Sequence, residues 1–349
     1  MAREILFART AKMLAPEPVT WAGRGSFPNK LCLGTEMGRL FWVDPDRGVL
    51  DSPSNVAGSG EAINGAAFTD KLMAVSNRSE VIVQEWIPGV GPVVLEGGAH
   101  GVIASESGRI VAPRGSEGLL IISPSDDGRF IPTTLISPGA DPYFYQTVQV
   151  GPSESGQELF ATACRDGGIA LIRLGPGGER GEFEVMSKKN PRTGEDADIV
   201  SLCPLNRPGY PYALALLAMD GTVYFTADVR TFAFTGMAFD KLNGTPYTIL
   251  SAQGHLFILT SEKLCFMKDF ADRAIRNPVG LSRDPVSSFS FGVDAVDSSI
   301  IDDEYLLLVY DSYLTVNRVS ELSQGLLPAQ SESQAFQPSE MMATSIGAA

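Results

Sequence analysis

Residues 158–174 read ELFATACRDGGIALIRL, and this stretch decides how the rest of the chain is interpreted. Two apolar runs, Leu159–Ala163 and Ile169–Leu174, lie on either side of Arg165-Asp166-Gly167-Gly168. Asp-Gly and Gly-Gly supply the positive φ values that a tight hairpin turn requires. The stretch therefore predicts an antiparallel β-hairpin.

The same hairpin pattern recurs along the whole chain. A third apolar strand is predicted before most of the pairs, as at residues 63–68, and residues 287–293 are assigned in this way to the last unit. A more polar fourth strand often follows, as at residues 130–136. The second strand of each pair is predicted to begin at Gly38, Ser79, Gly118, Gly168, Gly221, Glu262 and Ser312, at intervals of 39 to 53 residues.

Seven repeated units of three or four strands are typical of a β-propeller, in which each unit is one twisted antiparallel blade. A two-sheet sandwich also shows alternating strands, but it is not expected to show this sevenfold recurrence. We predict an all-β, seven-bladed β-propeller over residues 1–325, followed by a disordered tail over residues 326–349. The run Glu4–Arg9 is expected to pair as the outermost strand of the last blade and so to close the ring.

In architecture the chain resembles β-propeller repeat proteins of the WD40-like and YVTN-like kind over about residues 4–325. WD repeats carry Gly-His near their start and Trp-Asp near their end. Here Gly254-His255 stands at a strand start, and Trp42-Val43-Asp44 is not the dipeptide. The resemblance therefore implies only the architecture, and we expect apolar packing to hold the blades together.

Composition and charge narrow the range of partners and compartments. The 349 residues carry a formal net charge of −14, which makes nucleic acids and anionic membranes unlikely general partners. Glu4 and Arg9 interrupt the apolar core that a signal peptide would need, and no apolar run reaches the ~20 residues of a spanning helix. We expect a cytoplasmic protein that is monomeric in isolation.

The four cysteines lie far apart with no CxxC pair, which predicts four buried thiols and no metal site.

The residues that could act in catalysis do not form a recognisable catalytic motif. Lactonase-like propellers hold a divalent metal in the central channel, and the nearest oxygen donors here are Asn64, Glu106, Gln146 and Asp198. His100 and His255 lack a recognisable nucleophile elbow, because no GxSxG sequence occurs. We therefore expect no catalytic residues, no metal and no cofactor. A channel-centred, metal-dependent hydrolase or lyase remains the alternative.

An arginine recurs at the same place in three consecutive units: Arg78, Arg114 and Arg165 occupy equivalent hairpin turns. Equivalent positions on adjacent blades lie on one face, so the three guanidinium groups are expected to form an arc. Arginine suits bidentate recognition of carboxylates. The sequence thus predicts a non-catalytic protein-interaction module, a scaffold or regulatory subunit, whose partner presents an acidic segment to these arginines. Solvated turn arginines paired with neighbouring carboxylates are the simpler interpretation.

Two late segments also receive predictions. Lys268–Pro285 is expected to hold one short helix that ends at Asn277-Pro278, because the residue before a proline disfavours helix. Ile300-Ile301 is expected to lie in an acidic loop, either as an interaction spot or tucked inward.

Overall fold

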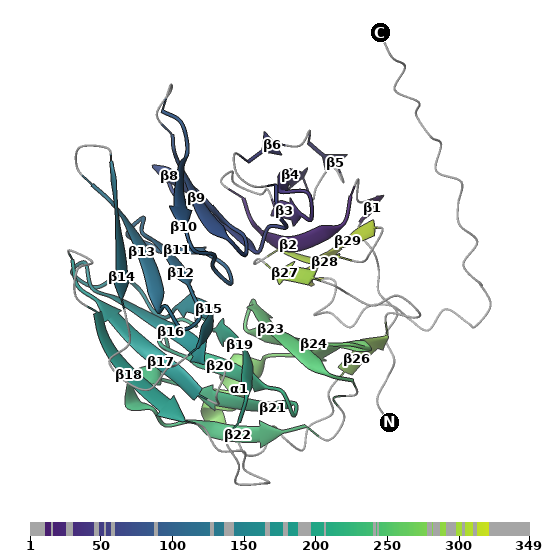
Figure 1. Cartoon of the computed structure of the whole chain (residues 1–349). Helices are drawn as coiled ribbons and strands as arrows, with labels where there is room; N and C mark the ends of the chain where they lie inside the picture. Colours follow the sequence, from purple (N-terminus) through teal and green to yellow (C-terminus); the bar gives the residue numbers. More distant parts are fainter. Residues whose placement is uncertain are drawn as a thin grey trace, which may run out of the picture.

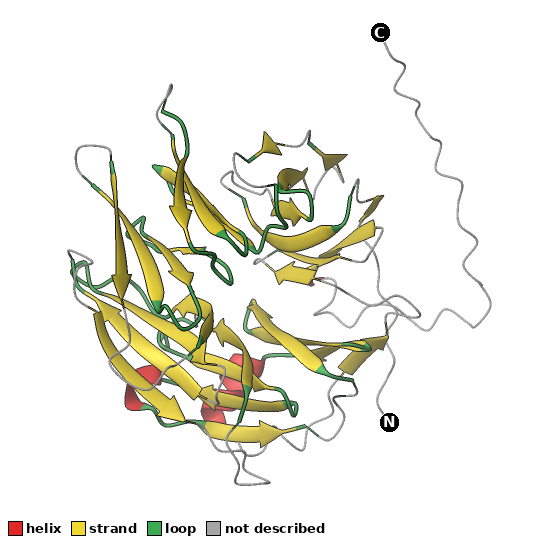
Figure 2. Ribbon diagram, in the orientation of Figure 1, coloured by secondary structure: helices red, strands yellow, loops and turns green. Residues whose placement is uncertain are grey.

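The structure is a computed structural model. It describes residues 11–320 except for the segments 15–16, 26–30, 45–48, 52–53, 57–59, 87–89, 126–128, 136–142, 165–167, 177–180, 188–196, 206, 240–241, 243, 278–280, 282–286, 291–297, 302–303 and 310–312. The described residues are almost entirely strands joined by loops (Figure 2). No helix among them is long and apolar enough to cross a membrane.

The described strands form seven small antiparallel sheets, numbered here in chain order (Figure 1). Sheet 1 contains β2 (Val19–Arg24), β3 (Leu31–Thr35), β4 (Arg39–Asp44), β5 (Val49–Leu50) and β6 (Ser54–Asn55). Sheet 2 contains β7 (Gly65–Phe68), β8 (Leu72–Ser76), β9 (Glu80–Glu85) and β10 (Val93–Glu96). Sheet 3 contains β11 (Ile103–Ala104), β12 (Ile110–Pro113), β13 (Leu119–Pro124) and β14 (Phe130–Leu135). Sheet 4 contains β15 (Phe144–Gln149), β16 (Glu158–Cys164), β17 (Gly168–Leu174) and β18 (Gly181–Ser187). Sheet 5 contains β19 (Ile199–Pro204), β20 (Leu214–Ala218), β21 (Thr222–Thr226) and β22 (Thr235–Ala238). Sheet 6 contains β23 (Pro246–Ala252), β24 (His255–Thr260), β25 (Lys263–Met267) and β26 (Ser287–Ser290). Sheet 7 contains β27 (Ser298–Ile301), β28 (Tyr305–Val309), β29 (Tyr313–Arg318) and β1 (Ala11–Leu14).

The hairpin predicted at residues 158–174 is confirmed. β16 pairs with β17 in register from Glu158 opposite Leu174 to Cys164 opposite Gly168, and the turn between them lies outside the described residues. Every residue of β16 is buried. Because successive side chains point to opposite faces of a strand, Ala161 packs toward sheet 5 while Phe160 packs toward sheet 3. Burial on both faces explains the unbroken apolar run.

Apolar packing joins each sheet to the next. Seven hydrophobic clusters of described residues each combine side chains from two sheets that are consecutive in the chain, or from the last sheet and the first. The cluster between sheets 7 and 1 brings Leu307 and Val316 against Leu33 and Phe41. In Figure 1 the sheets accordingly follow one another in chain order, and β27 of sheet 7 lies beside β2 of sheet 1.

The N-terminal end of the described chain belongs to the last sheet. β1 pairs antiparallel with β29, with Ala11 opposite Val316 and Leu14 opposite Tyr313. A strand from the N-terminal part of the described chain therefore completes sheet 7 beside β29. The segment that pairs is Ala11–Leu14, whereas the predicted segment Glu4–Arg9 lies outside the described residues.

Deleting residues 1–14 is expected to lower the free energy of unfolding by about 1–4 kcal/mol, at ~0.2–1 kcal/mol for each of the four residue pairs of the β1–β29 ladder. The deletion also exposes the edge of β29, so association between molecules should increase. Urea denaturation and size-exclusion chromatography measure the two effects. Deleting residues 1–10 alone leaves β1 in place and is the matched control; an equal loss in that variant would show that β1 is not the stabilising strand.

Some strand assignments from the sequence are wrong. Residues 287–290 form β26, the fourth strand of sheet 6, rather than a strand of the last unit. Ile300 and Ile301 lie in β27 and pair with β28, not in a loop. Val19–Arg24 form β2, a strand the repeat pattern did not identify. Polar serines in β26 and β27 weaken the alternation on which such assignments depend.

The short helix is where the sequence predicted it. α1 spans Phe270–Arg276 and ends with Asn277 as its C-cap, just before Pro278. Phe270, Ala271 and Ala274 are buried in the cluster between sheets 5 and 6. A short 3-10 turn, η1 (Val229–Thr231), follows β21. The predicted disordered tail, residues 326–349, lies outside the described residues.

Candidate functional site

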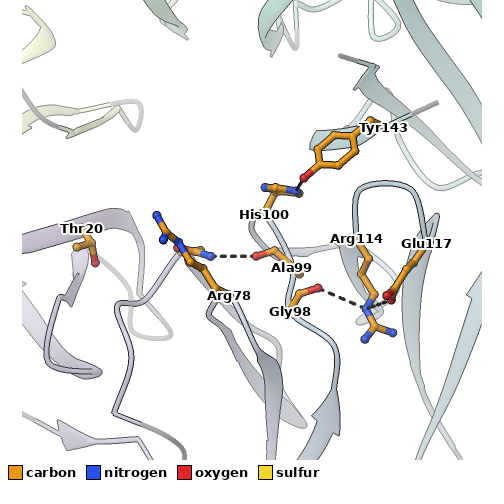
Figure 3. A pocket seen from close by; sticks show the side chains of 9 residues that line it. Thr20, Arg78, Gly98, Ala99, His100, Arg114, Glu117 and Tyr143 are labelled. Atoms are coloured by element: carbon orange, nitrogen blue, oxygen red, sulfur yellow. Dashed lines mark hydrogen bonds and ion pairs between the residues drawn. The ribbon is translucent and has the colours of Figure 1, made fainter. Parts of the chain in front are cut away.

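Two of the three predicted arginines line one pocket (Figure 3). Arg78 lies in the turn between β8 and β9, and Arg114 begins the turn between β12 and β13. Arg165 lies outside the described residues. The pocket has a volume of about 570 Å³, within the usual size of small-molecule sites. It is lined by Thr20, Asn64, Arg78, Gly98, Ala99, His100, Arg114, Glu117 and Tyr143, which come from sheets 1 to 4 and their connections.

The Arg114 side chain is held in place by the protein itself. Its guanidinium donates hydrogen bonds to the carbonyl oxygens of Glu96 and Gly98, and its Nε lies 3.5 Å from Oε2 of Glu117. Only 10% of this side chain is exposed. A Cβ at Gly97 would lie 1.7 Å from the guanidinium, so this close approach requires glycine. Arg114 therefore shapes the pocket, and Glu117 offsets its charge.

Arg78 differs from Arg114 because only its main chain is anchored. The Asn77 Oδ1 accepts hydrogen bonds from the amides of Ser79 and Glu80, both at 2.8 Å, which fixes the turn. The amide of Ala99 donates to the Asn77 carbonyl at 3.1 Å and ties this turn to the next segment. The Arg78 side chain is exposed, and it has no hydrogen bond or ion pair with any other described residue. Its guanidinium is thus the cation that the pocket offers to a ligand.

His100 and Tyr143 form a second polar pair in the pocket. The His100 Nε2 lies 2.7 Å from the Tyr143 hydroxyl, and the His100 amide donates to the carbonyl of Pro113 at 2.9 Å. The Tyr143 ring packs on Gly115, where a Cβ would lie 2.8 Å from it. Partial burial lowers the pKa of His100 below its usual value, so its imidazole is neutral at pH 7.

Gly98 fits tightly beneath Arg78, because a Cβ there would lie 2.0 Å from the Arg78 carbonyl oxygen. Gly98→Ala is expected to push the two segments apart and to lower the free energy of unfolding by about 1–3 kcal/mol. Urea denaturation measures the loss. Gly91→Ala is the control, since no atom of a described residue lies within 4 Å of a Cβ built at Gly91. Equal stability of the two variants would contradict the close contact.

The oxygen donors considered for a channel metal do not converge. Asn64 lies in the arginine pocket, whereas Glu106 lies in the turn between β11 and β12, where its Oε2 accepts an amide hydrogen bond at 3.0 Å from the loop before β16. The Gln146 Oε1 accepts an amide hydrogen bond at 2.8 Å from β19, and Asp198 is exposed just before β19. Among the residues that the structure describes, no group of three or more His, Cys, Asp or Glu side chains could hold a metal ion.

The second histidine and the four cysteines do not line the pocket and belong to the packing of the fold. The Nδ1 of His255 accepts a hydrogen bond from the Asp269 amide at 2.9 Å, at the beginning of the segment that leads into α1. The predicted buried thiols are confirmed: Cys32, Cys164, Cys203 and Cys265 are all buried, and none of them forms a disulfide in the described part of the chain. Burial raises the pKa of Cys203 to about 12 and that of Cys265 to about 11, so these thiols are protonated at neutral pH.

Several residues of the pocket were not identified from the sequence. Thr20 belongs to the strand that the repeat pattern missed, and Tyr143 precedes the first strand of the next sheet. The Gly97-Gly98 pair is visible in the sequence beside His100, but its function as packing space for two arginine segments depends on the fold. Comparing each unit with the residues just before the next unit could have identified Tyr143.

The chain was also compared with known proteins. No protein-family model matches it, and no curated protein matches it significantly. The functional interpretation therefore depends on the arrangement of its own residues.

Proposed function

We propose that the seven sheets are the blades of a β-propeller, and that this propeller is a non-catalytic protein-interaction module. The cyclic order of the apolar clusters supports the architecture, since each sheet packs on its chain neighbours and sheet 7 packs on sheet 1. Pairing of β1 with β29 supports closure by the N-terminal strand. The module is proposed to act as a monomer that presents its loops to a partner, as a scaffold or regulatory subunit.

The observation that carries the function is the exposed guanidinium of Arg78 at the rim of a polar pocket. An arginine that has no carboxylate partner among the described residues can donate two parallel hydrogen bonds to a carboxylate of a ligand. The turn beneath Arg78 is fixed by Asn77, so little further ordering of the main chain is required on binding. The proposed partner is a protein that inserts an acidic segment into this pocket.

The proposal is tested by purifying tagged protein from its native cells and identifying co-purifying proteins by mass spectrometry. Wild-type protein is compared with Arg78→Glu and with Arg24→Glu, which makes the same charge change at an exposed position outside the pocket. A stoichiometric partner that is lost only from Arg78→Glu supports the proposal. Equal recovery of that partner with all three proteins would overturn it.

A further inference from the structure

At neutral pH the described side chains that line the pocket carry one more positive charge than negative. Three of its lining side chains are ionised, and two of these, Arg114 and Glu117, offset one another at 3.5 Å. Arg78 is the third. Asn64 adds no charge, and its Nδ2 already donates to the Ala99 carbonyl at 3.1 Å. One cation matches one carboxylate better than a phosphate, whose charge at pH 7 is close to −2.

The His100–Tyr143 pair can change what the pocket offers. When the imidazole is neutral and Nε2 carries no proton, Nε2 accepts a hydrogen bond that the Tyr143 hydroxyl donates. Once His100 is protonated, Nε2 must donate, and the hydroxyl oxygen becomes the acceptor. Protonation thus reverses the direction of the hydrogen bond between the two side chains. One protonation therefore adds a positive charge to the pocket that Arg78 lines.

We propose that the pocket binds a single carboxylate group, and that the His100–Tyr143 pair strengthens this binding when the imidazole gains a proton. The inference depends on the function proposed above and specifies both its ligand chemistry and its response to pH. Arg78 provides the constant contact, and His100 provides the contact that varies.

The groups around His100 determine the direction of the pH effect. Arg78 and Arg114 oppose its protonation, Glu117 favours it, and the Tyr143 hydroxyl can hydrogen-bond to either form. In the free protein, burial lowers the pKa of His100. A bound carboxylate raises that pKa, so by linkage the affinity must increase as pH falls through the titration of His100. The increase ends where the ligand carboxylate itself takes up a proton, near pH ~4.3 for glutamate.

The experiment uses the full-length protein and three capped peptides, acetyl-Gly-Xaa-Gly-amide with glutamate, glutamine or phosphoserine at Xaa. The chain contains two histidines, so the His100 imidazole signals are identified in NMR spectra by their loss in His100→Gln. We expect the glutamate peptide to raise the pKa of His100 and to bind about three- to tenfold more tightly at about pH 5.5 than at about pH 7.5. The glutamine peptide should do neither, and the phosphoserine peptide should bind no more tightly than glutamate at about pH 7.5.

Two variants separate failure of this inference from failure of the proposed function. His100→Gln should lose the pH dependence of binding, while Tyr143→Phe should keep part of the pH dependence because the imidazole still gains its charge. Glutamate binding that depends on Arg78 but not on pH would overturn the His100 contact and leave the proposed function intact. Tighter binding of phosphoserine at about pH 7.5 would overturn the single-carboxylate assignment, and glutamate binding that is insensitive to Arg78→Glu would overturn both proposals.

Discussion

Replacing Arg78 with alanine is expected to weaken binding of an acidic ligand by about 1.5–3 kcal/mol, which is about a 10- to 150-fold rise in Kd. The reason is the state of the side chain in the free protein: it is exposed, and no described residue competes with the ligand for its donors. Arg78→Glu should weaken binding further, because it places a like charge in the path of the carboxylate. Isothermal titration calorimetry with the purified partner, or with a peptide of its acidic segment, measures these changes.

Arg78→Lys distinguishes a fork-shaped contact from simple charge attraction. Lysine keeps the charge but cannot donate two parallel hydrogen bonds, so we expect an affinity between those of wild type and Arg78→Ala. Binding should also weaken as salt is added, since exposed charges are screened. Arg24→Ala is the matched control and should leave Kd unchanged. Full retention of affinity in Arg78→Ala would contradict this account of the pocket.

The elements that the sequence predicted well carry strong local signals. The hairpin β16–β17 combines two apolar runs with turn glycines, and α1 ends at Asn277-Pro278. β26 lacks such signals: its four residues include three serines, and only pairing with β25 shows that it belongs to sheet 6. Tertiary pairing thus determines the position of strands whose own side chains carry little pattern.

The same distinction explains what could be predicted of the site. The repeat placed Arg78 and Arg114 at equivalent turns, and both line the pocket. Their different availability could not be predicted, because Arg114 is held by the carbonyl oxygens of Glu96 and Gly98, and main-chain carbonyls carry no sequence signal. The pair formed by His100 and Tyr143 likewise joins positions 43 residues apart. Contacts of this kind depend on how neighbouring sheets pack.

Breaking the buried ion pair between Arg109 and Glu158 is expected to have the largest effect on stability. The Arg109 Nη1 lies 2.8 Å from the Glu158 Oε2, and these side chains are 6% and 0% exposed. Arg109 also donates from Nη2 to the carbonyl of Gly175 at 2.9 Å, and the Glu158 Oε1 accepts from the Ser107 amide at 3.1 Å. The pair therefore connects the turn before β12 in sheet 3 to both ends of the β16–β17 hairpin in sheet 4.

Arg109→Met keeps much of the side-chain volume but leaves the Glu158 carboxylate buried without its cation. We expect the free energy of unfolding to fall by about 3–5 kcal/mol, because an unpaired buried charge loses its compensation and keeps its desolvation cost. Urea denaturation followed by tryptophan fluorescence measures the change. The double variant Arg109→Met with Glu158→Leu removes both charges, so it should recover a large part of the loss.

The exposed pair formed by Arg207 and Asp272 is the control for this prediction. It also joins an arginine to a carboxylate across two elements, with Nη2 and Oδ2 2.5 Å apart, but its side chains are 37% and 39% exposed. Solvent and salt screen such a pair, so Arg207→Met should change stability far less than Arg109→Met. If both single variants lose equal stability, burial is not what makes the Arg109–Glu158 pair important. If the double variant is no more stable than Arg109→Met, the loss of stability comes from the lost main-chain contacts of Arg109 rather than from the unpaired charge of Glu158.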